Sequence, residues 1–373
     1  MRLLFIVPYT PNRIRARPYY LLHHLAAQGA QITLLTLSAN EAERAEAQAL
    51  ESICERVLAL PLPAWRSAWN CLLAAPGRAP LQSAYCWHPG LAGRAGALLN
   101  GGNGRPAFDA IHVEHLRGVR YGLALARAAD GPGRKRPALV WDSVDCISHL
   151  FEQAAAQGRG LFGRWVTRFE LGRTRSYEPA VMAAFDQVLV SSAPDQQALL
   201  GLVPAGAPRP RVSVLTNGVD LDYFRPEPDE TRAPATLVVS GKMSYHANVS
   251  MVLYLAEQVM PLVWRQRPDV RLQVVGKDPP ARLRALAANP AVEVTGTVPD
   301  VRPYLRRATL ALAPLRYGAG IQNKALEAMA CGTPVLASPE ALGGLSAAPG
   351  RELATAADGP SMAAEILALL GDP

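Results

Sequence analysis

The sequence predicts an α/β protein made of two Rossmann-like domains, each a doubly wound parallel sheet covered by helices. Short apolar runs alternate with longer helical stretches, which is typical of strands joined by helical crossovers. The alternation starts afresh after a polar, proline-rich linker at residues 226–234. A length of 373 residues suits two domains of ordinary size. We therefore expect domains at residues 1–225 and 226–373 that face a cleft, because such sheets bind ligands at the carboxyl ends of their strands.

The elements of the first domain follow from apolar runs and helix boundaries. Its strands are predicted at residues 3–7, 31–37, 56–60, 110–113, 138–141, 187–191 and 212–215. Its clearest helices are predicted at residues 18–28, 40–54 and 163–184. Gly29 ends the first of these helices, and Asn40 is a suitable cap for the second.

The second domain repeats the same order of elements. Its strands are predicted at residues 236–241, 271–276, 292–296, 309–313 and 334–337. Helices are predicted at residues 249–266 and 301–307, from about 322 to 331, and near residues 362–370.

Composition narrows the class of protein. No run of about 20 apolar residues is present, so no membrane span is expected. The five cysteines form no CxxC pair, which favours a reducing cytoplasm over a disulfide frame or a zinc site. Residues 1–205 hold 21 Lys and Arg against 15 Asp and Glu, which is most of the net charge of +7. That excess suits a phosphate-bearing ligand or an anionic membrane face. Nucleic acid is not expected, because no helix-turn-helix, aromatic RNA motif or zinc module is present.

The segment at residues 309–337 carries the strongest functional signal. A strand runs into a turn with Gly318 and Gly320, and a helix that starts near Gln322 carries Lys324 and Glu327 in its first turns. Unpaired N–H groups at a helix start, with the helix dipole, favour a phosphate. Lys324 adds a positive charge, and Glu327 lies on the same face, where a carboxylate can accept hydrogen bonds from ribose hydroxyls. A nucleoside diphosphate is the ligand that combines these groups. A glycine corner that binds nothing is the alternative.

The same segment resembles a known family. Residues 326–335, LEAMACGTPV, are similar to the donor site of retaining glycosyltransferases of family 4, which have the two-domain GT-B architecture. The signature of that family has an earlier Glu, and Ala319 stands at its position here. Residues 320–324, GIQNK, resemble a subgroup associated with exopolysaccharide assembly.

The resemblance implies a set of donor contacts. Lys242, at the end of the first strand of the second domain, and Lys324 would neutralise the donor diphosphate in place of a metal. A solvated Lys242 is the alternative. The loop at residues 296–301 would line the base pocket. The expected donor-binding residues are Gly241, Lys242, Thr297, Val298, Gly320, Ile321, Gln322, Asn323, Lys324 and Glu327, of which Lys324 and Glu327 also act in catalysis.

Arginines follow the first strand where many relatives have a glycine pair. Arg13, Arg15 and Arg17 stand there instead and are expected to bind a phosphate. The alternatives are an anionic acceptor, a lipid head group, or solvated side chains.

Acidic residues follow later strands of the first domain. Asp142 is the candidate for positioning or activating the acceptor hydroxyl, with Asp145 and the pair at residues 114–115 as further candidates. Capping of the next helix is an equal alternative for the aspartates.

Aromatic residues stand among arginines in a stretch that has no clear period and is interpreted as irregular. Trp65, Trp69, Tyr85 and Trp87 could contact a membrane interface, or they could cover the core of the first domain.

Together these observations predict a retaining glycosyltransferase without cofactor or metal. Its co-substrate would be a nucleotide sugar, with UDP or GDP as the nucleotide. The acceptor would be a sugar or a lipid-linked sugar in cell-surface polysaccharide or glycolipid synthesis, at the inner face of a bacterial membrane that the protein contacts peripherally. A non-hydrolysing sugar-nucleotide epimerase and a catalytically inactive assembly partner are the alternatives.

Overall fold

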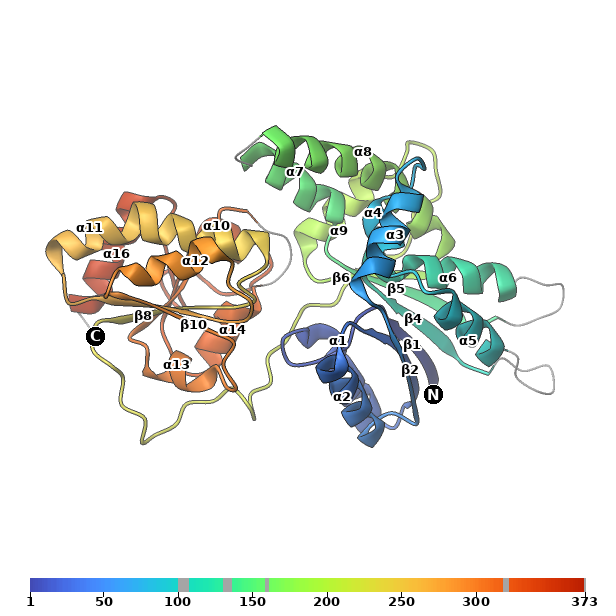
Figure 1. Cartoon of the computed structure of the whole chain (residues 1–373), viewed down its shortest axis with the longest axis horizontal. Helices are drawn as coiled ribbons and strands as arrows, with labels where there is room; N and C mark the ends of the chain where they lie inside the picture. Colours follow the sequence, from blue (N-terminus) through green and yellow to red (C-terminus); the bar gives the residue numbers. More distant parts are fainter. Residues whose placement is uncertain (100–106, 130–135, 158–160, 318–321, 372–373) are drawn as a thin grey trace. The chain divides into compact units, whose positions relative to one another are not determined.

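This computed structural model describes residues 1–99, 107–129, 136–157, 161–317 and 322–371. The chain divides into two compact units, Met1–Leu215 and Thr216–Pro373. The expected boundary at residue 225 lies inside the second unit. Figure 1 shows that each unit is a parallel sheet with helices on both faces, which confirms the predicted α/β architecture.

The first unit is built on a seven-stranded sheet in the order β3-β2-β1-β4-β5-β6-β7. Its strands are β1 (Arg2–Val7), β2 (Gln31–Ser38), β3 (Arg56–Pro61), β4 (Ala110–Glu114), β5 (Ala138–Val144), β6 (Gln187–Val190) and β7 (Val212–Val214). Its helices are α1 (Ala16–Ala27), α2 (Glu41–Ala49) with the 3-10 turn η1 (Leu50–Ser52), α3 (Ala64–Ala74), α4 (Leu81–Tyr85), α5 (Pro89–Leu99), α6 (His115–Ala129), α7 (Ile147–Gln157), α8 (Leu161–Ala184) and α9 (Ala193–Gly201).

Two of these helices correct the sequence interpretation. The aromatic stretch predicted to be irregular contains α3 and α4. Trp87 packs against the core and stacks on Tyr121 with ring centroids 5.0 Å apart, so it covers the core as one alternative proposed. Trp65 and Trp69 do not, because both side chains are exposed.

The second unit contains a six-stranded sheet in the order β10-β9-β8-β11-β12-β13. Its strands are β8 (Thr236–Ser240), β9 (Arg271–Val275), β10 (Val292–Gly296), β11 (Leu310–Ala313), β12 (Val335–Ala337) and β13 (Ala354–Thr355). Its helices are α10 (His246–Tyr254), continued by a π-helical turn η2 (Leu255–Val259) into α11 (Met260–Gln266), then α12 (Ala281–Arg284) with the 3-10 turn η3 (Ala285–Ala288), α13 (Arg302–Arg307), α14 (Asn323–Ala330), α15 (Pro339–Leu342) and α16 (Gly359–Gly371).

Each unit has its own hydrophobic core. The strands read as continuous apolar runs because helices cover both faces of a parallel sheet. In the first unit, separate clusters occupy the two faces of the sheet, and Leu4 and Phe5 contribute to opposite ones. In the second unit, one cluster surrounds β8 and β11. Among the described helices, none combines the length and apolar character needed to span a bilayer.

The five cysteines are all free. Four are buried, and the half-buried Cys71 donates from Sγ to the Leu81 carbonyl at 3.9 Å. Burial raises the pKa of the Cys71 thiol, and it raises the pKa of Cys54, Cys86 and Cys331 to about 11 and that of Cys146 to about 12.

Candidate functional site

The strand order of each unit fixes where a ligand can be held. In the second unit, β8 lies between β9 and β11. The chain adds β9 and β10 on one side of β8 and then crosses back to add β11 on the other side, so the strand order reverses between β8 and β11. Such a switch point leaves a crevice at the carboxyl ends of the strands. Residues after β8 and the start of α14 therefore come together there. The first unit has the same arrangement at β1 and β4.

Three glycines lie at the carboxyl ends of neighbouring strands of the second sheet at this point. Gly241, Gly276 and Gly296 follow or end β8, β9 and β10, with φ of 142°, 151° and 71°. A Cβ added to Gly276 would lie 1.7 Å from the Gly241 carbonyl oxygen, so only glycine allows this approach of two backbones. The N–H of Gly276 donates to the Gly296 carbonyl at 3.2 Å. We name these residues the glycine edge.

Lys324 reaches over the glycine edge from α14. Its Cε lies 3.6 Å from where a Cβ of Gly241 would stand, and its Nζ donates to Gln322 Oε1 at 2.9 Å. The side chain is half-buried, and desolvation lowers the pKa of Lys324 to about 8, although Glu327 opposes that shift. A cation that is only partly hydrated gains more from an anion than a solvated cation does.

Glu327 lies three residues further along α14, on the same side of the helix. Burial raises the pKa of Glu327 to about 7, and Lys324 works against the shift. The predicted pair is thus brought together. Each group carries a desolvation cost that a bound ligand with complementary groups can offset.

The remaining predicted donor residues occupy varied positions. Lys242 is exposed, and its carbonyl accepts from Asn248 Nδ2 at 2.9 Å. Thr297 is exposed, and Val298 packs against the core of the second unit. Asn323 Oδ1 accepts from Asn217 Nδ2 at 3.2 Å. Gly320 and Ile321, with Gly318 and Ala319, lie outside the described residues.

Sequence reasoning missed a pair of rings beside this edge. His246, at the start of α10, stacks on Tyr317 with centroids 5.5 Å apart and planes 13° apart. Its Nδ1 lies 2.9 Å from the Tyr317 hydroxyl. Desolvation lowers the pKa of His246, which favours its neutral form. The two residues are 71 positions apart, so no local signal could have joined them.

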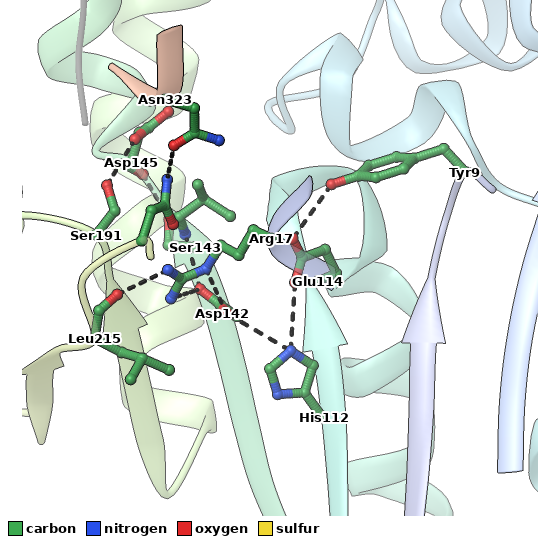
Figure 2. A network of polar contacts seen from close by, with 12 residues as sticks. Tyr9, Arg17, His112, Glu114, Asp142, Ser143, Asp145, Ser191, Leu215 and Asn323 are labelled. Carbon is green, nitrogen blue, oxygen red and sulfur yellow. Dashed lines mark hydrogen bonds and ion pairs between the residues drawn. The ribbon is translucent and has the colours of Figure 1, made fainter. Parts of the chain in front are cut away.

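In the first unit, a polar network lies at the carboxyl ends of β4 and β5 (Figure 2). Arg17 holds the Asp142 carboxylate with two hydrogen bonds, from Nε at 2.8 Å and from Nη2 at 3.0 Å. Its Nη1 donates to the Leu215 carbonyl at 2.7 Å. Both charged side chains are almost completely buried, at 7% and 0% exposure. Asp142 therefore lies at the expected strand end, with both oxygens already engaged.

Glu114 and His112 complete this network. His112 Nε2 lies 3.3 Å from Glu114 Oε2 and 3.7 Å from Asp142 Oδ2, and Tyr9 donates its hydroxyl to Glu114 Oε1 at 3.4 Å. Burial raises the pKa of the Glu114 carboxyl, and the Asp142 carboxylate raises it further. Ligand atoms of His112, Glu114 and Asp142 lie within 4.8 Å of one another. The Arg17 guanidinium supplies the positive charge at this cluster, and a divalent ion would have to displace it.

The backbone is strained where β4 and β5 end. His115 has φ of 60° and Val144 has φ of 69°, a conformation that is unfavourable for a β-branched residue. Strain of this kind persists where the surroundings hold it, and it concentrates at functional sites. Burial lowers the pKa of His115 to about 3, with Arg117 adding to the shift, so its imidazole is neutral. This residue was one of the pair at 114–115 expected near the acceptor.

The three arginines after β1 lie in different environments, and Arg17 is engaged with Asp142. Arg13 is exposed. Arg15 pairs with Glu43 at 2.9 Å and also donates to the Thr10 carbonyl at 3.1 Å, so much of its donor capacity is used within the protein.

The capping alternative for the aspartates is wrong. At the start of α7, the Cys146 N–H donates to Asp195 Oδ1 at 2.8 Å and the Ile147 N–H donates to Glu178 Oε1 at 2.9 Å. Neither Asp142 nor Asp145 has that role. Burial raises the pKa of Asp145 to about 7, with the Asp195 carboxylate contributing.

Comparison with known proteins agrees with this description. Residues 234–372 match the family model described as Glycosyl transferases group 1. D-inositol 3-phosphate glycosyltransferase 1 of Catenulispora acidiphila is 28% identical over 301 residues, which cover 74% of this chain and 59% of that relative. The chain thus spans little more than half the length of this curated relative.

Solved structures resemble the whole chain in fold. Alr3699/HepE of Anabaena, solved in complex with UDP and glucose, has a TM-score of 0.64 at 14% identity and covers 100% of this chain and 90% of its own. WaaG, a glycosyltransferase involved in lipopolysaccharide biosynthesis, has a TM-score of 0.62 at 16% identity, with 99% and 90% coverage. The predicted GT-B fold is confirmed.

Proposed function

We propose that this chain, whose residues 234–372 form a glycosyl transferases group 1 domain, is a retaining glycosyltransferase. It moves a sugar from a nucleotide-diphosphate sugar to a hydroxyl acceptor, with UDP or GDP as the nucleotide. Its role is in the synthesis of cell-surface polysaccharide or glycolipid.

The observation that carries this proposal is the position of Lys324 over the glycine edge. Gly276 lets the backbone of Gly241 come close to β9, and Lys324 brings a partly hydrated cation over Gly241 at the carboxyl end of β8. A diphosphate is the anion that suits these features, and its charge would raise the depressed pKa of Lys324. Glu327 is close enough along α14 to accept hydrogen bonds from the ribose of the same nucleotide.

The transfer step follows from the charge that develops on the leaving group. The acceptor oxygen forms a bond to the anomeric carbon, the bond from that carbon to the phosphate oxygen breaks, and the acceptor proton passes to a phosphate oxygen. Attack on the face that the leaving group departs from retains the configuration. Lys324, with Lys242, stabilises the growing negative charge, so these cations contribute most in the transition state.

The network of the first unit is assigned to the acceptor side. Asp142 is a positioning residue in this proposal, because both of its oxygens hold Arg17 rather than a ligand. Glu114 belongs to the same network as a positioning residue, because it is fully buried and its oxygens contact Tyr9 and His112. His115 is partly exposed and neutral, so its Nε2 is the candidate in this proposal for a hydrogen bond to a sugar hydroxyl. The acceptor is a sugar or a lipid-linked sugar, and the protein meets the inner face of the cell membrane peripherally.

A nucleotide screen tests the proposal. Thermal unfolding is measured with UDP, GDP, ADP and TDP sugars, and the nucleotide that raises the midpoint is then used in transfer reactions whose product is examined by NMR for anomeric configuration. We expect one nucleotide to stabilise the chain and the product to keep the configuration of the donor sugar.

Three results would contradict the proposal. The absence of any stabilising nucleotide would remove the donor site. An epimer formed from donor alone would favour the epimerase. Nucleotide binding without turnover over a broad acceptor panel would favour an inactive assembly partner.

A further inference from the structure

Helix α3 presents its large apolar side chains to solvent. Trp65, Trp69, Leu72 and Leu73 are 65%, 54%, 62% and 64% exposed. Their spacing of four, three and one residues places them along one side of the helix. We name these four residues the apolar face of α3. A helix on a globular core normally has the reverse orientation, with its apolar stripe directed inward.

Polar and small residues hold the opposite side of α3 against the protein. Ser67 is buried, and Asn70 donates from Nδ2 to the Trp87 carbonyl at 2.8 Å and to the Tyr85 carbonyl at 3.3 Å. Cys71 contacts the Leu81 carbonyl. These contacts fix the rotation of α3 on α4 (Figure 1). The outward position of the apolar face is therefore determined by specific hydrogen bonds.

The chain around α3 carries only positive charge. No Asp or Glu occurs between Glu55 and Asp109, whereas five arginines do, namely Arg56, Arg66, Arg78, Arg94 and Arg105. Arg66 lies over the Trp65 ring, with its guanidinium carbon 5.3 Å from the ring centroid. Arg78 is exposed in the turn that follows α3. Apolar side chains flanked by cations are the composition that an anionic bilayer surface attracts.

A neighbouring helix extends the same surface. Arg173 of α8 donates to the Ala79 carbonyl at 3.3 Å and also to the Ala75 carbonyl, which ties α8 to the end of α3. Its guanidinium carbon lies 4.0 Å from the centroid of the Phe169 ring, and that ring is 37% exposed. An exposed aromatic ring on a second element thus lies next to the turn after α3.

We propose that the apolar face of α3 docks the protein on a bilayer with anionic head groups. The two tryptophans and two leucines enter the boundary between head groups and acyl chains, while Arg66 and Arg78 contact the lipid phosphates. Tryptophan suits this boundary because its ring is large and apolar and carries a polar N–H. This inference deepens the membrane contact in the proposed function by naming the surface that makes it.

A second copy of the chain fits this surface less well. An 11-residue helix is roughly 16 Å long, and a stable dimer needs about 800 Å² from each partner. In a symmetric pair, each arginine would also face the other copy's arginines. A bilayer avoids both difficulties, because it presents negative charge and needs no matching protein surface.

Co-sedimentation of the full chain with large vesicles tests the inference. The vesicles are phosphatidylcholine with 30% phosphatidylglycerol, or phosphatidylcholine alone. We expect Leu72→Ser with Leu73→Ser to lower the partition coefficient on anionic vesicles at least tenfold. Leu221→Ser, the same change at a 67% exposed leucine of the second unit, leaves it unchanged. Arg66→Gln with Arg78→Gln weakens binding to anionic vesicles by about fivefold per cation and leaves the weak binding to neutral vesicles unaltered.

Fluorescence quenching locates the helix. Brominated lipids should quench the wild-type chain, and they should quench a Trp65→Phe, Trp69→Phe chain much less, while sedimentation of that variant changes little because the aromatic bulk is kept. Thermal unfolding accompanies each variant, and its midpoint should be unchanged, since the substituted side chains are exposed.

Two results would overturn the inference. One is a Leu72→Ser, Leu73→Ser chain that sediments with anionic vesicles as the wild type does. The other is a wild-type dimer in analytical ultracentrifugation that the same double variant dissociates, which would assign the face to a second copy. UDP binding by calorimetry separates this inference from the proposed function, because the leucine variants should keep it. If UDP fails to bind while vesicles still do, only the proposed function is lost.

Discussion

Lys324 and Glu327 carry opposite charges and lie near each other, yet desolvation moves both pKa values toward neutrality, to about 8 and about 7. Desolvation thus outweighs the mutual attraction of the two charges. A diphosphate beside Lys324 and ribose hydroxyls beside Glu327 would restore the interactions that burial removed. Desolvation disfavours the charged forms of both side chains, and a nucleotide with complementary groups would offset that cost. We therefore expect substitutions of either residue to change nucleotide binding and sugar transfer.

Glu327→Ala should weaken the binding of UDP, or of whichever nucleotide the screen selects. The ribose hydroxyls would lose charge-assisted hydrogen bonds of roughly 1.5–3 kcal/mol, which corresponds to a tenfold to hundredfold loss in affinity. Calorimetry measures the affinity, and Glu340→Ala, at an exposed position on α15, is the control. An unaltered dissociation constant would exclude the ribose contact.

Lys324→Ala should lower kcat more than it weakens donor binding, because negative charge grows on the leaving phosphate. The binding of nucleotide should also depend on pH. It strengthens as Glu327 loses its proton through about pH 7 and weakens as Lys324 loses its proton through about pH 8. Calorimetry across pH 5.5–9.5 and steady-state kinetics measure both effects. Equal losses in kcat and affinity would refute the transition-state role, and a flat pH profile would refute the titration.

At the scale of elements, the glycine edge sets how closely β8 and β9 approach. The Gly276 position is filled by the Gly241 carbonyl, whereas nothing lies within 4 Å of a Cβ added to Gly296. The two glycines therefore differ in packing, although both have positive φ. Alanine substitutions at Gly276 and Gly296 therefore separate the effect of the close strand approach from the effect of positive φ.

Gly276→Ala should destabilise the second unit by roughly 3 kcal/mol or more and abolish nucleotide binding, because the new methyl group must push two backbones apart. Gly296→Ala should cost only about 1 kcal/mol, the ordinary penalty for a left-handed conformation. Urea unfolding followed by circular dichroism compares the two. Similar losses for both variants would mean that backbone conformation, rather than the strand approach, decides stability here.

The elements could be predicted from the sequence wherever their apolar residues face a core. The seven strands of the first sheet and β8 to β12 of the second are such cases, because continuous apolar runs mark strands that are covered on both faces. The two-residue strand β13 was not predicted, because it is too short and only half-buried. Helix α3 was missed although its apolar residues recur at helical spacing, because the segment is only 11 residues long and prolines lie on both sides of it. In the functional sites, Lys324 and Glu327 belong to one local motif and were found together. Arg17 and Asp142 are 125 residues apart, and no local sequence pattern near either residue indicates that they pair.

The whole molecule consists of two units with separate cores and separate sheets. Cooperative unfolding follows the core, so each unit can respond to a ligand by itself. The residues proposed to bind the donor lie in the second unit, and the buried Arg17–Asp142 network lies in the first.

Calorimetric scanning should therefore resolve two unfolding transitions, and nucleotide should raise only one. At a free concentration of 100 times the dissociation constant, a ligand stabilises its binding unit by about 2.7 kcal/mol, a shift of roughly 5–10 °C for a domain of this size. Gly276→Ala should lower the same transition that nucleotide raises. If both transitions moved together, the units would be thermodynamically coupled.

The buried thiols have a practical consequence for studying the protein. A maleimide reacts with the thiolate, and the raised pKa values of the native cysteines keep that form scarce near neutral pH. The native cysteines should therefore react slowly with a maleimide, and the wild-type sequence is a suitable starting point for site-directed labelling. A single new cysteine at an exposed position such as Leu72 could carry a spin label or dye without prior removal of the other five.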